Sequence, residues 1–346
     1  MAMVSHLGDD SRLAGGLAGA GGVITDSGLL SGGSVLSTFS GADSLFAGAI
    51  NDGTFRSLSL YKDGVGVLGL SGASNYSGVT KVYQGALSVS HGSALGATSG
   101  STVVFAGAAL RIAGGITSGE PLFLSGAGVA GTGVLRNLSG ANTLSGAIAL
   151  SAPSRFVSDA GTLTLGGAVS GVGHALTLGG AGDLVLAAAN TFSGGLNVSQ
   201  GTVTVNNSGA LGTGAATVSN TGTLVINNTV TNDIHVTGNG TTGGTLVSTT
   251  SLGNVDVGNR GTVARGASIG SFTTSSMTLS GGARLEFKIW DINTKIAGVG
   301  YDQYAFGNLD LSGASVSNKV VIKLISLTDG TNHGAAGHLS LLQGIA

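Results

Sequence analysis

The chain of 346 residues contains no cysteine and only two prolines, and charged and aromatic residues make up just 9% and 5% of it. Without cysteine, the protein can form neither disulfides nor a thiolate zinc site. The scarcity of proline and the lack of a strict Gly-X-Y period exclude a collagen triple helix. Because 14 Lys and Arg stand against 16 Asp and Glu, the chain has no basic excess with which to bind a nucleic acid.

Long apolar runs are also absent. No stretch of about 18 apolar residues occurs, so we expect no transmembrane segment. Residues 1–10 lack the basic start and the continuous apolar segment of a signal peptide. The chain is therefore expected to be either a cytosolic protein or a piece of a longer exported chain, and the repeats described below favour the second.

Glycine and aliphatic residues are abundant instead. The chain has 65 Gly, 42% hydrophobic residues and a mean hydropathy of +0.41, which argues against a solvated, disordered chain. Apolar and hydroxyl side chains alternate in short runs such as 161–165, 201–205 and 222–226. This period of two places aliphatic side chains on one face of a β-strand and Thr or Ser on the other.

Larger units repeat along the chain. A short strand, a turn and two further short segments recur in residues 66–96 and 182–212, partially in 133–148 and weakly in 39–50. Repeats of short strands indicate a solenoid, in which each coil buries its aliphatic face against the next coil. With about 20–25 residues per coil, successive coils would pair as parallel strands about 4.8 Å apart.

A β-sandwich is the alternative fold, since its strands also alternate. Sandwich hairpins favour two-residue turns such as Asn-Gly, and Asn239-Gly240 is the one such pair in the sequence. Aromatic residues, which sandwiches use more heavily, are also scarce here. The pattern favours the solenoid.

The repeated unit resembles the autotransporter-associated β-strand repeat of bacterial passenger regions. It reads Leu-Ser-Gly-Ala-Asn-Thr, a hydrophobic residue, Ser-Gly, then Gly-Thr-Leu-x-Val and Ser-Gly-Ala-Leu-Gly. The matching segments are 70–78 with 85–96, 138–146, and 186–212, and residues 62–68 resemble the lead-in of the repeat. The resemblance implies an all-β fold, a right-handed parallel β-helix, displayed outside a bacterial cell and often acting as an adhesin.

The ends of the sequence depart from this family. No signal peptide precedes the repeats, and residues 341–346 close the sequence without the alternating strands that anchor such passengers in the membrane. We expect either a fragment or a member that is exported by another route.

Residues 281–346 differ in composition, because charged residues cluster there around the only tryptophan, Trp290. The open end of a solenoid exposes strand edges, so repeat arrays end in atypical capping units. We therefore predict a flexible start at 1–12, β-solenoid repeats at 13–280 and a C-terminal β cap at 281–346. The alternative interpretation of the last segment is a binding patch around Trp290 and Tyr301.

No arrangement of residues points to catalysis. The histidines lack the spacing of a metal motif; they are His6, His91, His174, His235, His333 and His338. Asp52 and Asp63 could share one face as paired acids for polysaccharide cleavage, although a solvated surface is the simpler interpretation. We predict no catalytic residue, metal or cofactor.

The sequence therefore predicts a non-enzymatic extracellular surface protein, a rod-like passenger that serves adhesion, surface coating or scaffolding. One alternative is a self-assembling filament subunit, because open coil ends can pair head to tail. A polysaccharide-active β-helix enzyme is the other. The expected partners are the surface of a host or neighbouring cell, or further copies of the chain.

Overall fold

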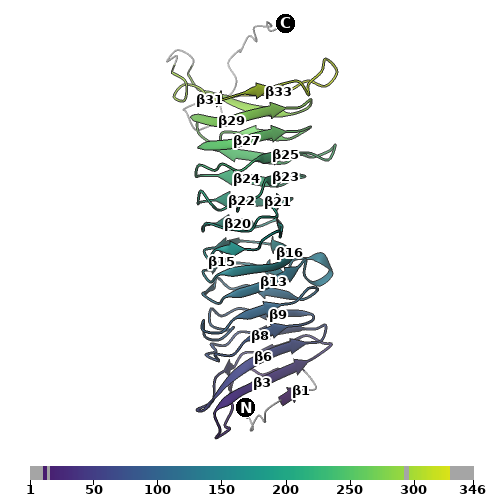
Figure 1. Cartoon of the computed structure of the whole chain (residues 1–346), viewed down its shortest axis with the longest axis vertical. Helices are drawn as coiled ribbons and strands as arrows, with labels where there is room; N and C mark the ends of the chain where they lie inside the picture. Colours follow the sequence, from purple (N-terminus) through teal and green to yellow (C-terminus); the bar gives the residue numbers. More distant parts are fainter. Residues whose placement is uncertain (1–10, 14–15, 292–295, 328–346) are drawn as a thin grey trace. The chain divides into compact units, whose positions relative to one another are not determined.

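The computed structural model describes residues 11–13, 16–291 and 296–327, and the chain divides into two compact units, 1–214 and 215–346. Short parallel strands stacked coil upon coil build each unit (Figure 1). The one helical turn in the described residues is the 3-10 turn η1 (Val129–Gly131), so none of these residues forms a helix that could cross a membrane. The predicted all-β parallel solenoid is confirmed.

In the unit 1–214 the strands form three stacks, which we call the first, second and third faces. The first face contains β1 (Ser11–Leu13), β3 (Gly32–Phe39), β6 (Arg56–Asp63), β8 (Thr80–Val82), β10 (Thr102–Val104), β13 (Leu122–Gly126), the first part of β16 (Ile148–Ser158) and β18 (Val169–Ser170). The second face contains β4 (Ser44–Phe46), β7 (Val67–Leu70), β9 (Ala86–Val89), β11 (Ala109–Ile112), β14 (Leu135–Asn137), the last part of β16, β19 (Leu176–Gly179) and β21 (Leu196–Val198). The third face contains β12 (Thr117–Ser118), β15 (Ala141–Leu144), β17 (Thr162–Leu165), β20 (Asp183–Leu186) and β22 (Thr202–Val205). A separate pair joins β2 (Val23–Ile24) to β5 (Ala49–Ile50).

In the unit 215–346 the strands form two stacks. One contains β23 (Ala216–Val218), β25 (Ile234–Val236), β27 (Ser251–Val257), β29 (Ser271–Leu279), β31 (Gln303–Phe306) and β32 (Leu309–Asp310). The other contains β24 (Thr223–Ile226), β26 (Thr245–Ser248), β28 (Thr262–Ala264), β30 (Arg284–Ile289) and β33 (Val321–Ser326).

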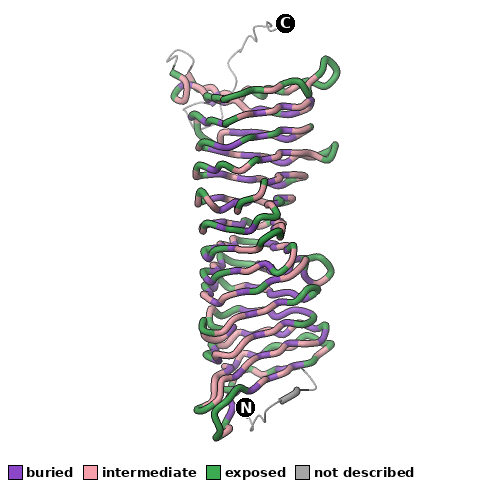
Figure 2. Tube along the Cα trace, in the orientation of Figure 1, coloured by how far each residue is buried: buried purple, intermediate pink, exposed green. Residues whose placement is uncertain are grey.

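The core of each unit is a set of aliphatic columns that run from coil to coil. Leu87, Leu110 and Leu135 pair in register on successive coils and are completely buried. Along β17 and β22 buried residues alternate with half-buried ones, and Figure 2 shows buried and less buried stretches following one another along many strands of both units. Burying each such side chain contributes about 1.5–3 kcal/mol to stability. The apolar residues that recur with a period of two in the sequence therefore stabilise the stacking of each coil on the next.

The repeats share one inter-coil hydrogen bond at their Asn or Ser position. There a side-chain oxygen accepts a hydrogen bond from a backbone N–H of the preceding coil, in a buried setting. The bonds run from Ile50 N to Ser74 Oγ (3.1 Å), from Ile116 N to Asn142 Oδ1 (2.7 Å) and from Val169 N to Asn190 Oδ1 (2.7 Å). The partial copy at 133–148 therefore shares this inter-coil hydrogen bond with the two fuller copies.

The coil grows longer near the end of the described chain. Thr262 of β28 pairs with Arg284 of β30, and the path between them contains only β29. Arg284 in turn pairs with Val321, and the longer path between those two contains both β31 and β32. The predicted cap at 281–346 thus begins with strands that continue the stack, and its role as a cap stays a prediction. Residues 1–10 of the predicted flexible start, and 292–295 and 328–346 of the cap, lie outside the described residues.

Candidate functional site

Aromatic side chains gather on the outer side of the first face. Tyr61 belongs to β6 and Phe123 to β13, while Tyr83 and Phe105 directly follow β8 and β10. Tyr83, Phe105 and Phe123 are 36%, 39% and 43% exposed, although aromatic side chains normally contribute large buried areas. We call Tyr61, Tyr83, Phe105 and Phe123, together with Lys81, the aromatic patch.

Strand alternation and register explain why these rings lie together. Val82 and Val104 point into the core, so the residues that follow them, Tyr83 and Phe105, point outward. Tyr61 pairs with Lys81 across β6 and β8, and Tyr83 donates its backbone N–H to Lys62 O at 2.9 Å. Neighbouring coils at strand spacing therefore bring successive rings within contact distance.

Three of the four rings, those of Tyr61, Tyr83 and Phe105, contact one another across the coils. The ring centroids of Tyr83 and Phe105 are 4.8 Å apart with an interplanar angle of 9°, and those of Tyr61 and Tyr83 are 5.8 Å apart at 79°. Each such pair contributes about 0.5–1.5 kcal/mol beyond area burial. These contacts orient the rings of Tyr61, Tyr83 and Phe105 relative to one another.

Lys81 places a positive charge within the patch. Its Nζ lies 4.9 Å from the centroid of the Tyr61 ring, a distance at which a cation is attracted to the face of an aromatic ring. Hydrogen bonding with the Tyr61 hydroxyl raises the pKa of Lys81 above its usual value, so the ammonium stays charged at neutral pH. Exposed flat rings beside one cation can stack on the apolar faces of sugars or on side chains of a partner protein.

Lys62 supports the patch from the inner side of β6. Its ammonium donates hydrogen bonds to the backbone carbonyls of Asp63, Gly64 and Gln84, which joins two neighbouring coils at their corner. Burial lowers the pKa of Lys62 to about 8. The lead-in lysine recognised in the sequence is therefore a structural crosslink, and it is 2% exposed.

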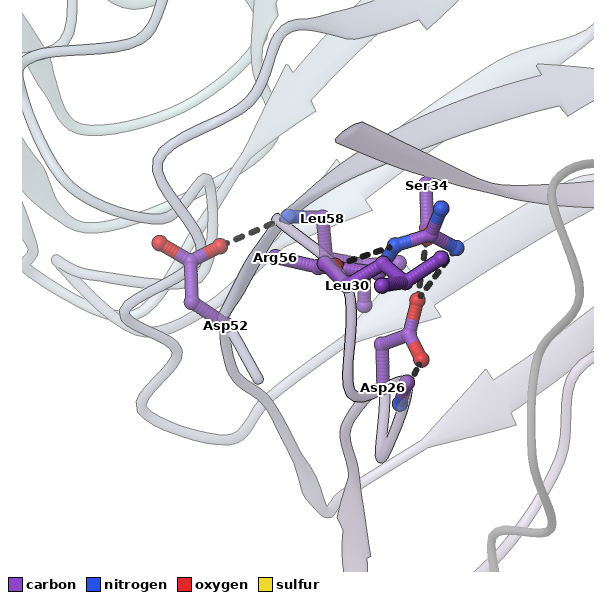
Figure 3. Close-up of polar contacts among 7 residues, drawn as sticks. Asp26, Leu30, Ser34, Asp52, Arg56 and Leu58 are labelled. Carbon is purple, nitrogen blue, oxygen red and sulfur yellow. Dashed lines mark hydrogen bonds and ion pairs between the residues drawn. The ribbon is translucent and has the colours of Figure 1, made fainter. Parts of the chain in front are cut away.

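The buried carboxylate of Asp26 also ties coils together. Figure 3 shows Asp26 directed toward Ser34, which donates a hydrogen bond to it, and toward Arg56, whose Nη1 lies 3.6 Å from Asp26 Oδ2. The Gly28 N–H donates to Oδ1 at 2.7 Å. Burial raises the pKa of Asp26, but these hydrogen bonds and the Arg56 charge outweigh that effect and hold it below its usual value.

Asp52 and Asp63 bind separate backbone donors. Asp52 accepts hydrogen bonds from Leu58 N (2.7 Å), Ser77 N (3.0 Å) and Ser77 Oγ (2.6 Å), the first of which is drawn in Figure 3. Asp63 accepts one from Gly64 N at 2.7 Å. Asp52 thus serves as a link between strands and loops, and this does not favour its use as a general acid.

Trp290 and Tyr301 lie next to each other along an antiparallel backbone contact. Ile289 bridges to Tyr301, and Trp290 N donates to Gly300 O at 2.8 Å. Trp290 is 45% exposed, whereas the Tyr301 ring stacks on Phe287 with centroids 6.3 Å apart. A binding patch formed by Trp290 and Tyr301 stays a prediction.

The histidines in the described residues occupy separate places. His91 Nδ1 accepts a hydrogen bond from Ser93 N at 3.1 Å, and His235 Nδ1 lies 3.6 Å from Asp256 Oδ2. Within 11–13, 16–291 and 296–327, no group of three or more His, Asp or Glu side chains could hold a metal ion. His6, His333 and His338 lie outside the described residues.

Sequence reasoning missed the aromatic patch, although a signal was present. Tyr61, Tyr83 and Phe105 are evenly spaced in the sequence, at an interval that matches the coil length expected for the repeats. Residues that recur at the coil length fall on the same face of neighbouring coils. Once a coil length is assumed, a search for exposed residue types at that interval would have found the patch.

Two segments of the chain, 60–89 and 176–205, match the passenger-associated-transport-repeat family. The adhesin BmaC autotransporter of Brucella suis biovar 1 (strain 1330) is 45% identical to the chain over 98 residues, which are 25% of this chain and 2% of that relative. No solved structure matches the chain. The matched segments overlap the two fuller repeats, 66–96 and 182–212, so these two repeats predicted from the sequence are confirmed.

Proposed function

We propose that this chain is a non-enzymatic adhesin that binds neighbouring cells through its aromatic patch. Its repeats are those of an autotransporter passenger region, which belongs at the surface or outside of a bacterial cell. The observation that carries the proposal is the exposed, mutually stacked set of Tyr83 and Phe105 beside Tyr61 and Lys81. Exposed rings of this kind are typical of binding surfaces, where they combine large contact area with low loss of conformational entropy. The adhesin name of the relative is consistent with this use.

The solenoid contributes stiffness and display. Because each coil is held by backbone pairing and by a continuous aliphatic core, the patch keeps its geometry without support from other parts of the chain. Adhesion, surface coating and scaffolding all require such a rigid support, and the patch favours adhesion among them.

A binding assay on intact cells tests the proposal. Fluorescently labelled chain is added to cultured host cells or to bacterial cells, and the bound fraction is measured against protein concentration. We expect the double variant Tyr83→Ser/Phe105→Ser to bind at least about tenfold more weakly, because truncating a central aromatic contact typically costs about 2 kcal/mol or more.

The matched control removes two exposed aliphatic side chains of the same unit that lie outside the patch. Leu29 and Val172 are 81% and 87% exposed, so Leu29→Ser/Val172→Ser should bind as the parent chain does. Equal binding by the aromatic variant, with an unchanged circular dichroism spectrum, would show that the patch is not the adhesive surface.

Self-assembly into filaments stays an alternative prediction. Negative-stain microscopy of the purified chain tests it directly: ordered fibres would favour a filament subunit over a monomeric adhesin. A reducing-sugar assay on polysaccharides tests the enzymatic alternative in the same preparation.

A further inference from the structure

A polar pocket of about 480 Å³ opens on the unit 215–346. Its lining includes three cationic side chains, Arg260, Arg284 and Lys319, and the amide side chains of Asn259 and Asn318. No carboxylate of the described residues lines it. Three positive charges in one pocket are unexpected in a chain whose net charge is −2.

The stacking of the coils brings these cations together. Arg260 N donates to Gly282 O at 2.9 Å, and Gly282 N donates to Lys319 O at 2.9 Å. Arg284 closely follows Gly282 and pairs with Val321. The three cations therefore come from three successive passes of the chain, and the parallel register fixes their spacing.

Among the described residues, the pocket cations have no acidic partner, whereas some other cations do. Arg136 forms an ion pair with Asp159, and Lys323 forms one with Glu286 at 2.8 Å. In the part of the chain that the structure describes, no carboxylate lies within ion-pair distance of the three pocket cations; Arg260 Nη1 reaches only the Thr241 carbonyl, at 3.5 Å. Like charges held together in this way repel one another until an anion neutralises them.

Arg260 and Gly282, which line the pocket, have a positive φ. Arg260 has a φ of 61°, in the left-handed region that few non-glycine residues adopt and that is found often at functional sites. Gly282 has a φ of 81°, and a Cβ there would lie 2.2 Å from Asn259 Oδ1. Glycine at 282 thus lets Asn259 lie against the pocket wall.

We propose that this pocket binds an anionic saccharide, namely one sulfated or carboxylated unit of a longer polysaccharide. Guanidinium groups bind sulfate and carboxylate through paired hydrogen bonds, and the Asn259 and Asn318 amides offer donors and acceptors for sugar hydroxyls. The volume lies in the range of pockets that hold small organic molecules rather than a single inorganic ion. This goes beyond the proposed adhesion through the aromatic patch, because it concerns a different unit and a ligand selected by charge.

Isothermal titration calorimetry on the full chain tests the proposal with four probes: a heparin hexasaccharide, a hyaluronan hexasaccharide, neutral maltohexaose and inorganic sulfate. We expect at least one of the two anionic oligosaccharides to bind, with an affinity that falls as salt is raised from about 50 to about 200 mM because screening weakens charge contacts. Arg284→Gln and Lys319→Gln should each weaken binding roughly tenfold, as expected for the loss of one charge-assisted contact.

Lys323→Gln is the matched control. It removes one positive charge from β33, close to the pocket in sequence, but from a side chain already paired with Glu286, so it should leave binding within about twofold of the parent chain. The proposal would be overturned if the control lost as much affinity as the pocket variants, or if neither anionic probe bound. It would also be overturned if maltohexaose bound as tightly as the anionic probes, or if sulfate bound as tightly as either oligosaccharide. Tyr83→Ser/Phe105→Ser should bind the anionic probe normally, which separates this proposal from the adhesive role of the aromatic patch.

Discussion

Gly96 lies directly against the buried side chain of Tyr76 in the preceding coil. A Cβ at position 96 would stand 2.3 Å from Tyr76 O and 3.0 Å from two atoms of its ring. Gly212 lies against Phe192 with nearly the same spacings, 2.4 Å and 3.0 Å. The two repeats thus use one device: a buried aromatic ring covered by a glycine of the next coil.

Gly96→Ala should lower the free energy of unfolding by roughly 2–4 kcal/mol, because the new methyl group meets backbone and ring atoms and because φ is +91° at this position. Chemical denaturation followed by circular dichroism measures the change. Gly41→Ala is the control, since nothing lies within 4 Å of a Cβ there; it should change stability by less than about 1 kcal/mol. Equal stability of both variants would contradict the role assigned to Gly96.

Asn190→Leu should destabilise the protein by roughly 2–4 kcal/mol, because unpaired buried polar groups are costly. The substitution leaves Val169 N–H and Ala210 C=O without the side-chain partners that they have at 2.7 Å and 2.6 Å. Asn190→Ser should recover part of the loss, because Ser74 accepts the equivalent hydrogen bond from Ile50. Thermal denaturation of the three proteins tests this order; a serine variant no better than the leucine variant would refute it.

Glu120 should make stability depend on pH. Burial raises the pKa of Glu120 to about 7; the side chain is 2% exposed, Thr102 donates to Oε1 at 3.2 Å and Oε2 has no partner among the described residues. The folded state therefore binds more protons than the unfolded state between about pH 4.5 and 7, so this group's contribution to stability declines as pH rises through that window and is constant above it.

Glu120→Gln isolates that contribution. The difference in free energy of unfolding between variant and parent should grow by roughly 1–3 kcal/mol in favour of the variant from about pH 4.5 to 7. Denaturation curves at several pH values measure it. A difference that stays constant with pH would show that Glu120 titrates normally in the folded protein.

Asp52→Ala should cost roughly 2–3 kcal/mol, because Leu58 N and Ser77 N and Oγ lose their common acceptor. Asp52→Asn keeps an acceptor oxygen and should lose less. Chemical denaturation of both variants measures the two losses. If the parent chain cleaved a polysaccharide and the asparagine variant kept its stability but lost that activity, Asp52 would have a catalytic role in addition to its structural one.

The sequence predicted the parallel coils because the apolar alternation and the repeated turns recur at one period. It did not predict which aromatic residues are exposed. Tyr76 and Tyr83 lie close together in the same repeat, yet Tyr76 is completely buried and Tyr83 is 36% exposed. The corners between these two residues change which side chains of the next strand point inward. The backbone path through the corners determines this, and the sequence pattern does not show that path.

Lys62 shows a second limit. A lysine is expected on the solvent side of an amphipathic strand, but Lys62 occupies an inward position of β6. Three carbonyls converge at the corner beyond it and receive its hydrogen bonds. The pocket cations escaped prediction for a similar reason, since Arg260 and Lys319 are far apart in the sequence and meet only through the stacking of coils.

The long segment between β30 and β33 leaves the strand register intact, since all six residues of β30 pair with consecutive residues of β33. Within that segment β31 and β32 pair with β29, whereas the corner between β32 and β33 lies outside the ladder of paired strands and supplies Asn318 and Lys319. A solenoid of this kind can accept new corner segments without a change in its paired strands. Ligand-binding residues in the corners can therefore differ between relatives, or be introduced by design, on the same stack of coils.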